Sequence, residues 1–467
     1  MNLTLIAIVG GYMLALAAIS FWARRYAKTA HSFTSGGSNF PAILIGFLLM
    51  SEFIGTTASV GTAQVAYKQG ISSAWNLAAL GVGFVLFAFL MARRFKDMQE
   101  NTISGAMART YGEPVRFATS VIMIFALQIV AISVYTSGGA VLAGLLKIDR
   151  TLAIVIVGVI GVLYVSLGGM RSVIYTNVLH AMVKYLGIAI ALGYALSKVG
   201  GYEQLHARLP ASMFSLTGVG WGQIGAWMVA GVGAVLATQY VVQAIATVPD
   251  GRRARAASFY SALLIVPFGI AAAIVGMCCV LLFPNINALQ AFPTLVASMN
   301  DFMAGLVVAG LAGSLFGTIS ALSMGTATLI YKDFYARFFQ RDKTDEVSAL
   351  RFVRIATIVV GLIPIPLAVA STEVLNVTFL AKSLRATLAV LLLIAFYAPR
   401  FGSPRGALAS ILLSLFVTIG WYLAGNPFGI DNAYVALAIP LVVMALSHPF
   451  RGKGRVAAGV KLEHGTR

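Results

Sequence analysis

Residues 46–61 read GFLLMSEFIGTTASVG, and they lie inside a long apolar segment. The stretch holds one carboxylate, Glu52, followed by a run of glycine, threonine and serine that continues a helix poorly. Inside a bilayer, unwound backbone is tolerated only where it is buried in protein or lines a water-filled cavity. The stretch therefore predicts a membrane-spanning helix that is broken near its middle, next to a cavity.

The composition places the whole chain in a membrane. Of its 467 residues, 59% are hydrophobic and only 10% are charged, whereas a soluble domain has about 25% charged residues. The expected fold class is therefore an all-α polytopic membrane protein. The two cysteines, Cys278 and Cys279, are adjacent in an apolar run, so they indicate neither a disulfide framework nor a zinc site.

Apolar segments long enough to span a bilayer follow one another along the chain. A spanning helix needs about 20 apolar residues, and by that measure we expect about thirteen spans. Their ranges are 3–22, 39–66, 72–92, 117–144, 151–168, 174–196, 222–247, 258–283, 301–330, 352–371, 374–397, 405–424 and 432–448. The connecting loops are too short for a soluble catalytic domain, so we expect one transmembrane domain over residues 1–450.

Basic residues set the expected orientation of these spans. With the N-terminus outside, the basic loops around Arg93, Arg109, Arg252 and Lys332 all fall in the cytoplasm, as does the tail 451–467. The formal net charge of +18 is then a signal of topology. The expected partners are the lipid bilayer and a small solute, and nucleic acid is not among them.

Two further stretches resemble the first in placing small polar residues inside a span. Residues 226–243, AWMVAGVGAVLATQYVVQ, interrupt the seventh span, and an inverted repeat would put two broken spans in such corresponding positions. Residues 314–335 are rich in hydroxyl groups, and Ser314 and Thr318 share a helix face because they are four residues apart. Hydroxyl and carbonyl oxygens suit a dehydrated Na⁺. The alternatives are close helix packing through small residues and hydroxyl groups that bond their own helix.

Ionisable side chains inside spans are costly, at roughly 2.5–3.5 kcal/mol near the helix centre, and they indicate function by default. The residues concerned are Glu52, His180, Lys184, Lys382 and Arg385. Glu52 has two possible roles. It contacts the solute or a cation, or it forms an internal ion pair with Lys382 or Arg385. Lys382 and Arg385 share a helix face, and a solute carboxylate would suit them. Lys184 snorkels to the membrane surface, pairs with another charged side chain or takes part in transport. His180 is expected to pack between helices.

Enzyme motifs are missing from the sequence. It contains no GxxxxGK[ST], HExxH, CxxC or GxSxG. We therefore expect no enzymatic activity and no cofactor, and we interpret the scattered intramembrane polar groups as a transport path.

Four segments, in order along the chain, resemble the sodium:solute symporter family, whose members transport proline, pantothenate, monocarboxylates, sialic acid and sugars. The segments are 32–70, 164–183, 239–267 and 313–335. The resemblance implies a five-plus-five inverted-repeat core with one extra N-terminal helix, the two repeats covering about 39–196 and 222–397.

The same resemblance implies where ions and solute bind. The Na⁺ site would use the backbone carbonyls of Ile45 and Leu48 together with Ser314, Gly317 and Thr318. The substrate region would contain Glu52, Gln239, Tyr240 and Gln243.

Three positions depart from the family's pattern, and one of them, Leu263 in place of the basic residue of sugar-transporting members, argues against a sugar. Gly317 stands where a serine ligand is usual, and Asn177 stands where an aspartate is usual. Both changes leave H⁺ as an alternative coupling ion, which Glu52 would carry.

Together these features predict a secondary active symporter that imports a small polar organic solute, of carboxylate or amino acid type, by alternating access. A Na⁺ gradient would drive it. The alternatives are an H⁺-coupled or uncoupled transporter on the same fold and a transporter-like sensor. We expect a functional monomer in a bacterial-type inner (plasma) membrane.

Overall fold

The computed structural model describes residues 3–37, 39–146, 148–339, 345–371 and 375–450. These residues form helices joined by turns, and none of them belongs to a β-strand, which confirms the all-α class. The predicted cytoplasmic tail, 451–467, lies outside the described residues.

The first half of the chain contains the first broken span and the longest helices. Its helices are α1 (Leu3–Arg24), α2 (Ala30–Ser35), α3 (Ala42–Phe53), a π-helical turn η1 (Thr57–Gly61), α4 (Thr62–Gln69), a short 3₁₀ turn η2 (Gly70–Ala74), α5 (Trp75–Leu90), α6 (Ala92–Met98), α7 (Ile103–Tyr111), α8 (Glu113–Leu146), α9 (Arg150–Val199) and α10 (Tyr202–Arg208).

The second half begins with the second broken span. Its helices are α11 (Trp221–Leu236), α12 (Gln239–Ala246), α13 (Gly251–Leu282), α14 (Ala291–Ala297), α15 (Asp301–Leu329), a π-helical turn η5 (Ile330–Tyr335), α16 (Ala336–Phe338), α17 (Glu346–Leu362), α18 (Pro364–Ala370), α19 (Leu375–Tyr397), α20 (Pro404–Leu423) and α21 (Asn432–Ser447).

Each predicted apolar range falls on one of these helices or on a helix pair. Within the described residues, nine helices are long and apolar enough to cross a membrane, and the bent pair α11–α12 makes a tenth. The expected count of about thirteen spans includes shorter helices such as α3 and α21, and it stays a prediction, as does the inverted repeat.

Helix α15 lies at the centre of the bundle and packs most extensively on α9. The two backbones approach closely because glycines line the contact. A Cβ at Gly310 would lie 2.9 Å from the carbonyl oxygen of Val183, and one at Gly187 would lie 3.4 Å from the Cα of Val307. Small residues at such positions are how helices pack closely inside membranes.

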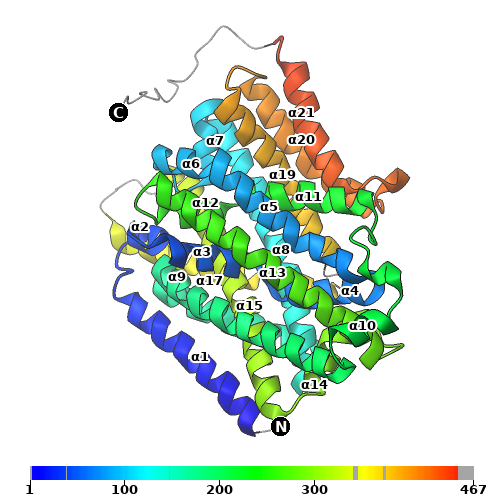
Figure 1. Cartoon of the computed structure of the whole chain (residues 1–467). Coiled ribbons are helices and arrows are strands. Elements are labelled where there is room, and N and C mark those ends of the chain that lie inside the picture. The colour runs from blue at the N-terminus through cyan, green and yellow to red at the C-terminus, as the bar shows by residue number, and fades with distance from the viewer. Residues whose placement is uncertain (1–2, 38, 147, 340–344, 372–374, 451–467) are drawn as a thin grey trace.

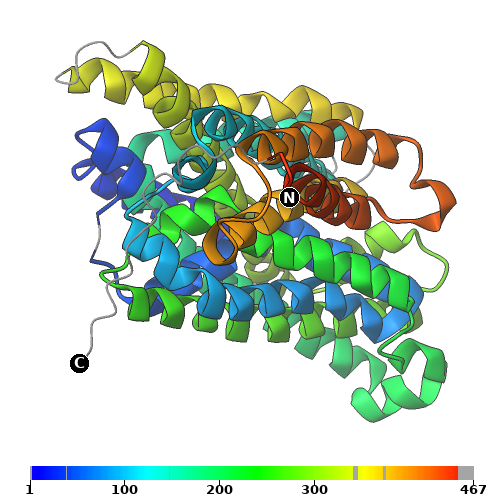
Figure 2. The same cartoon turned by 90° about the horizontal axis from the view of Figure 1, so that it is seen from above.

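The remaining helices surround this centre (Figure 1). Helix α1 lies along one edge, on α9 and α15, whereas α20 and α21 pack together against α19 (Figures 1 and 2). Large apolar side chains on the outer faces are exposed, between 67% and 73% for Leu14, Phe21, Leu263, Phe416 and Leu446. Exposed apolar faces of this extent match a lipid environment.

Basic segments meet at one end of the bundle, where Lys96 donates to Ala246 O and Lys332 to Asn101 Oδ1, and we call this the basic end. It contains α6, α7 and η5, and the sequence predicts that it faces the cytoplasm. Helix α7 begins there at Ile103, and the side chain of the preceding Thr102 accepts a hydrogen bond from the Gly105 N–H as an N-cap.

The kink in α9 generates a first testable prediction. Gly169 has φ +62°, and a Cβ there would lie 2.8 Å from the carbonyl oxygen of Phe33. Gly169→Ala should therefore lower the free energy of unfolding by more than about 1 kcal/mol, which thermal unfolding of the purified protein measures. Gly193→Ala, in the same helix with open space around its Cβ, is the matched control and should be neutral or slightly stabilising. Equal behaviour of the two variants would contradict the strain assigned to Gly169.

Candidate functional site

The break predicted in residues 46–61 is present. Helix α3 ends at Phe53, Ile54 leaves the helical conformation with ψ 77°, and the chain resumes as the π-helical turn η1. The Ile54 N–H still bonds the Met50 carbonyl, but later carbonyls of α3 lack regular helical partners. Side chains from two other helices meet them: Lys184 Nζ of α9 donates to Ser51 O at 2.5 Å, and Thr318 Oγ1 of α15 donates to Glu52 O at 3.1 Å.

Glu52 is buried at this break, with only 1% of its surface exposed. Within the described part of the chain, neither of its carboxyl oxygens has a hydrogen-bond partner. Phe53 contacts Phe84 and Tyr240 edge-to-face beside it. A buried carboxylate without partners costs several kcal/mol, so its oxygens are available to a cationic or hydroxyl group of a ligand.

The second predicted break is also present. Helices α11 and α12 meet at an angle of 41°, with Ala237 and Thr238 between them. Arg385 of α19 lies at this break: its Nη1 donates to Thr238 Oγ1 at 2.9 Å and its Nε to Ala381 O at 3.1 Å. Tyr240 lies within electrostatic range of both Arg385 and Glu52. The two breaks therefore bring an acidic and a basic side chain toward one tyrosine.

The internal ion pair considered for Glu52 does not form in the described structure. Lys382 Nζ lies 4.4 Å from the centre of the Phe379 ring, which stacks on Trp227, and Arg385 bonds Thr238 and Ala381. Among the described residues, Lys184 is the cation whose positive charge attracts the Glu52 carboxylate.

Gln239 and Gln243 are hydrogen-bonded within the chain. Gln239 accepts from the Ile103 N–H at 3.0 Å and donates to Asn101 O at 2.9 Å. Gln243 donates to Thr34 O at 2.5 Å and to Thr328 Oγ1 at 3.1 Å. Both amides tie α12 to neighbouring segments near the basic end.

The residues predicted to bind Na⁺ lie where α3 crosses α15. Ile45 and Leu48 are fully buried in α3. Thr318 Oγ1 also donates to Ser314 O at 3.0 Å, and Ser314 Oγ donates to Gly310 O at 3.1 Å, so both hydroxyls bond their own helix as well. The oxygen atoms of these hydroxyls keep acceptor lone pairs that could face a cation.

The structure explains why residue 317 is glycine. A Cβ at Gly317 would lie 2.6 Å from Asn177 Oδ1 and 3.0 Å from Ser51 Oγ. The Ser51 hydroxyl donates to Asn177 Oδ1 at 2.7 Å, and it therefore fills the space that a side chain at 317 would need. The sequence did not single out Ser51, although it precedes Glu52 directly.

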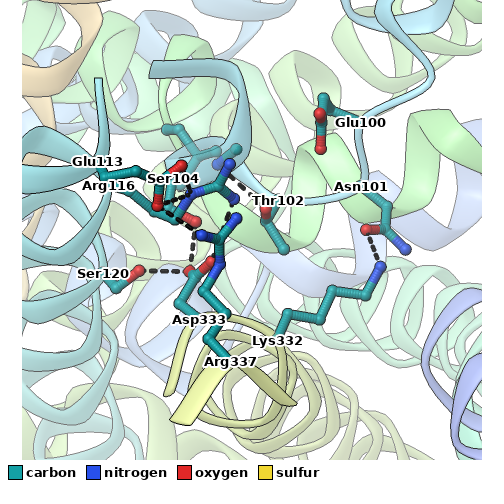
Figure 3. Close-up of polar contacts among 12 residues, drawn as sticks. Glu100, Asn101, Thr102, Ser104, Glu113, Arg116, Ser120, Lys332, Asp333 and Arg337 are labelled. Atoms are coloured by element: carbon teal, nitrogen blue, oxygen red, sulfur yellow. Dashed lines mark hydrogen bonds and ion pairs between the residues drawn. The ribbon is translucent and has the colours of Figure 1, made fainter. Parts of the chain in front are cut away.

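A cluster around Asp333 closes the basic end (Figure 3). The fully buried Asp333 carboxylate accepts hydrogen bonds from Ser104 of α7 and Ser120 of α8, the latter at 2.5 Å. It also pairs with Arg116 at 3.4 Å. Asp333 thus joins η5, α7 and α8.

The same view shows two neighbouring contacts (Figure 3). Lys332 Nζ donates to Asn101 Oδ1, and Arg337 pairs with Glu113 at 2.5 Å. Because Asn101 also accepts from Gln239, this cluster is continuous with the end of α12.

All the side chains that the sequence assigned to the substrate region are enclosed. Glu52, Gln239, Tyr240, Gln243, Lys382 and Arg385 are each at most 8% exposed. The structure therefore represents a closed arrangement of the region between the breaks.

Comparisons with known proteins point to one family and one fold. The family model of the sodium:solute symporter family matches residues 33–414. A solved structure of a Na⁺-coupled sialic acid symporter, in a substrate-bound outward-open state, is similar with a TM-score of 0.82 and 17% sequence identity, over 97% of this chain and 98% of that chain.

Two other solved transporters are similar over most of the chain. Mhp1, a nucleobase-cation-symport-1 family transporter in a closed conformation with bromovinylhydantoin, gives a TM-score of 0.64 at 14% identity, over 91% of this chain and 96% of that chain. MhsT in complex with L-phenylalanine gives a TM-score of 0.55 at 15% sequence identity, over 88% of this chain and 99% of that chain. At these identities the likeness concerns the fold alone.

Gly317 supplies a prediction about packing. Gly317→Ser should lower the free energy of unfolding by about 1–3 kcal/mol, because the new side chain overlaps Asn177 and Ser51. Adding Ser51→Ala removes one of the two overlapping atoms and should restore part of the loss. Thermal unfolding of both variants measures this, and a stable Gly317→Ser single variant would show that the contact is looser than described.

Asp333 supplies a prediction about the basic end. Asp333→Ala leaves Arg116 without its buried partner and should cost about 3–5 kcal/mol of unfolding free energy. Glu113→Ala, which removes a half-exposed carboxylate that pairs with the same arginine, should cost only about 0–1 kcal/mol. Chemical denaturation in detergent measures the unfolding free energy of the two variants. Equal losses of unfolding free energy would contradict the structural role assigned to Asp333.

Proposed function

The chain belongs to the sodium:solute symporter family, and we propose that it is a secondary active symporter that imports a small polar organic solute together with a cation. Membership confirms the resemblance drawn from the four sequence segments. Family and apolar helices together support a multi-pass membrane protein that acts as a transporter.

One observation carries the solute site: two buried, opposite charges lie at the two helix breaks. Glu52 lies in the last turn of α3, Arg385 bonds Thr238 between α11 and α12, and Tyr240 lies within electrostatic range of both charges. Broken helices with polar groups at their ends are a recurrent way to build a transporter site near the bilayer midplane.

The two charges favour a zwitterionic solute of amino acid type. A solute carboxylate suits the planar Arg385 guanidinium, which forms paired hydrogen bonds with carboxylates. A solute ammonium group suits Glu52, whose carboxyl oxygens lack partners among the described residues. Phe53 and Tyr240 supply an apolar and aromatic wall beside them.

The remaining predicted contacts take supporting roles in this proposal. The amides of Gln239 and Gln243 are hydrogen-bonded within the chain, so we assign them to positioning α12. Lys382, whose ammonium group lies over the Phe379 ring, is assigned to the wall of the path.

Na⁺ is the proposed coupling ion, bound by the carbonyls of Ile45 and Leu48 with Ser314, Gly317 and Thr318. Thr318 already joins α15 to the last turn of α3 through Glu52 O. A cation there would fix the end of α3 and with it the Glu52 side chain. Ion and solute would then raise each other's affinity by the same factor, as linkage requires.

Transport by reconstituted protein tests this proposal. Proteoliposomes with an inward Na⁺ gradient should accumulate at least one member of a labelled panel of amino acids and small carboxylates, compared with choline in place of Na⁺. Glu52→Gln should raise the half-saturating concentration of that solute roughly 10- to 100-fold, because it loses a charge-assisted contact worth about 1.5–3 kcal/mol.

Glu113→Gln is the matched control, since it makes the same change at a half-exposed position of the basic end. It should transport like the unaltered protein. Accumulation that is equal in Na⁺ and choline would reject Na⁺ coupling. Unchanged solute affinity in Glu52→Gln would reject the solute site while leaving transport itself intact.

A further inference from the structure

The end of α3 is capped by a cation that belongs to the chain. Lys184, 2% exposed in α9, donates from Nζ to Ser51 O at 2.5 Å and to Ser51 Oγ at 2.9 Å. Carbonyl groups at the end of a helix carry partial negative charge and attract cations. The ammonium group thus provides the positive charge that the break of α3 attracts.

This ammonium group lies beside the proposed Na⁺ site. Ser51 Oγ, which Lys184 contacts, is 3.0 Å from where a Cβ of Gly317 would be. Thr318 bonds the next carbonyl of α3, that of Glu52. Like charges this close in a buried environment repel strongly, since the low effective dielectric screens them weakly. Lys184 at Ser51 and Na⁺ at the neighbouring oxygens therefore oppose each other.

A cavity next to Lys184 offers its ammonium group a second position. The cavity has a volume of about 10 Å³, room for roughly one water molecule, and Lys184, Ser59 and Ser314 provide its polar lining. Ser59 is 2% exposed, and its hydroxyl has no hydrogen-bond partner within the ranges that the structure describes. A buried hydroxyl group of this kind is suited to receive a displaced ammonium group.

We propose that Lys184 is a built-in cation that competes with Na⁺ for the end of α3. When Na⁺ binds, Lys184 leaves Ser51 and turns into the cavity toward Ser59; when Na⁺ leaves, Lys184 returns and caps the break. The inference rests on the proposed function, and it adds a residue that sets the strength of Na⁺ binding.

The charge around Lys184 agrees with this exchange. Glu52 is the carboxylate that acts on it. His180, one turn earlier on α9, is hydrogen-bonded to Tyr12 of α1. When Na⁺ binds, the Lys184 ammonium group moves only a short distance. The negative charge of Glu52 is therefore close to whichever cation, Lys184 or Na⁺, occupies the end of α3.

Na⁺ binding to the purified protein tests the competition without knowledge of the solute. Thermal unfolding is followed as NaCl replaces choline chloride at constant ionic strength, because an ion that binds the folded state raises the unfolding temperature. Lys184→Met should reach half of its maximal stabilisation at a Na⁺ concentration at least about tenfold lower than the unaltered protein. Lys184→Arg, which keeps the charge, should not bind Na⁺ more tightly than the unaltered protein.

Matched controls separate the charge at the break from general effects. Lys198→Met makes the same change near the end of α9 on an outward side chain, and should leave the Na⁺ dependence unaltered. Ser59→Ala removes the second position and should weaken Na⁺ binding. Ser73 is also a buried serine whose hydroxyl has no partner among the described residues. Ser73→Ala should therefore leave Na⁺ binding unaltered. If Lys184→Met fails to fold, Lys184→Gln replaces it.

The outcomes distinguish this inference from the proposed function. Equal Na⁺ dependence in Lys184→Met and the unaltered protein would overturn the competition and leave a Na⁺ site in place. Absence of any Na⁺ stabilisation in every variant would overturn the Na⁺ site and the competition together, whereas solute uptake in proteoliposomes would still report on transport. Tighter binding in Lys184→Met alone supports the competition.

Discussion

A helix that ends inside a membrane leaves carbonyl groups that lipid cannot satisfy, and the interior of this protein is organised around one such end. Helix α3 stops at Phe53. Lys184 from α9 and Thr318 from α15 reach its last carbonyls. Since each exposed backbone group at this depth would cost several kcal/mol, the position of α3 relative to α9 and α15 follows from these contacts.

Close packing of α15 on α9 makes this arrangement possible. Glycines at 310 and 317 allow the two helices and the end of α3 to approach, because a Cβ at either position would lie within 3 Å of a neighbouring atom. The hydroxyl of Ser51 and the amide of Asn177 occupy the space beside Gly317. The Ser51 hydroxyl, on the opposite helix, thus lies where a side chain at position 317 would be.

The buried polar residues divide into two groups with different physical roles. Asp333, Gln239 and Gln243 are hydrogen-bonded within the chain, and they connect helices near the basic end. Glu52 and Arg385 lie at the breaks, and the carboxyl oxygens of Glu52 have no hydrogen-bond partner among the described residues. This division is what a transporter requires, because some polar contacts must hold its ends closed while others exchange partners with solute and ions.

Much of this could be predicted from the sequence, because helix breakers and charges in apolar segments violate a strong local pattern. Each break follows from residues within one span, and so does the presence of a buried carboxylate, Glu52, at the first break. The partners could not be predicted in the same way. Lys184 contacts Ser51 across 133 positions, and Ser104 contacts Asp333 across 229. Such contacts depend on how helices pack, and a glycine such as Gly317 gives no sign in the sequence of the side chains that surround it.

Hydrogen exchange at residues 46–61 tests most directly whether the break of α3 responds to a cation. Exchange would be measured by mass spectrometry in NaCl and in choline chloride of equal ionic strength, with α20 as the internal reference. We expect the amides of 46–61 to exchange more slowly in NaCl and those of α20 to be unchanged, because a bound cation orders the end of α3. Identical exchange of 46–61 in the two salts would contradict a cation site at this break.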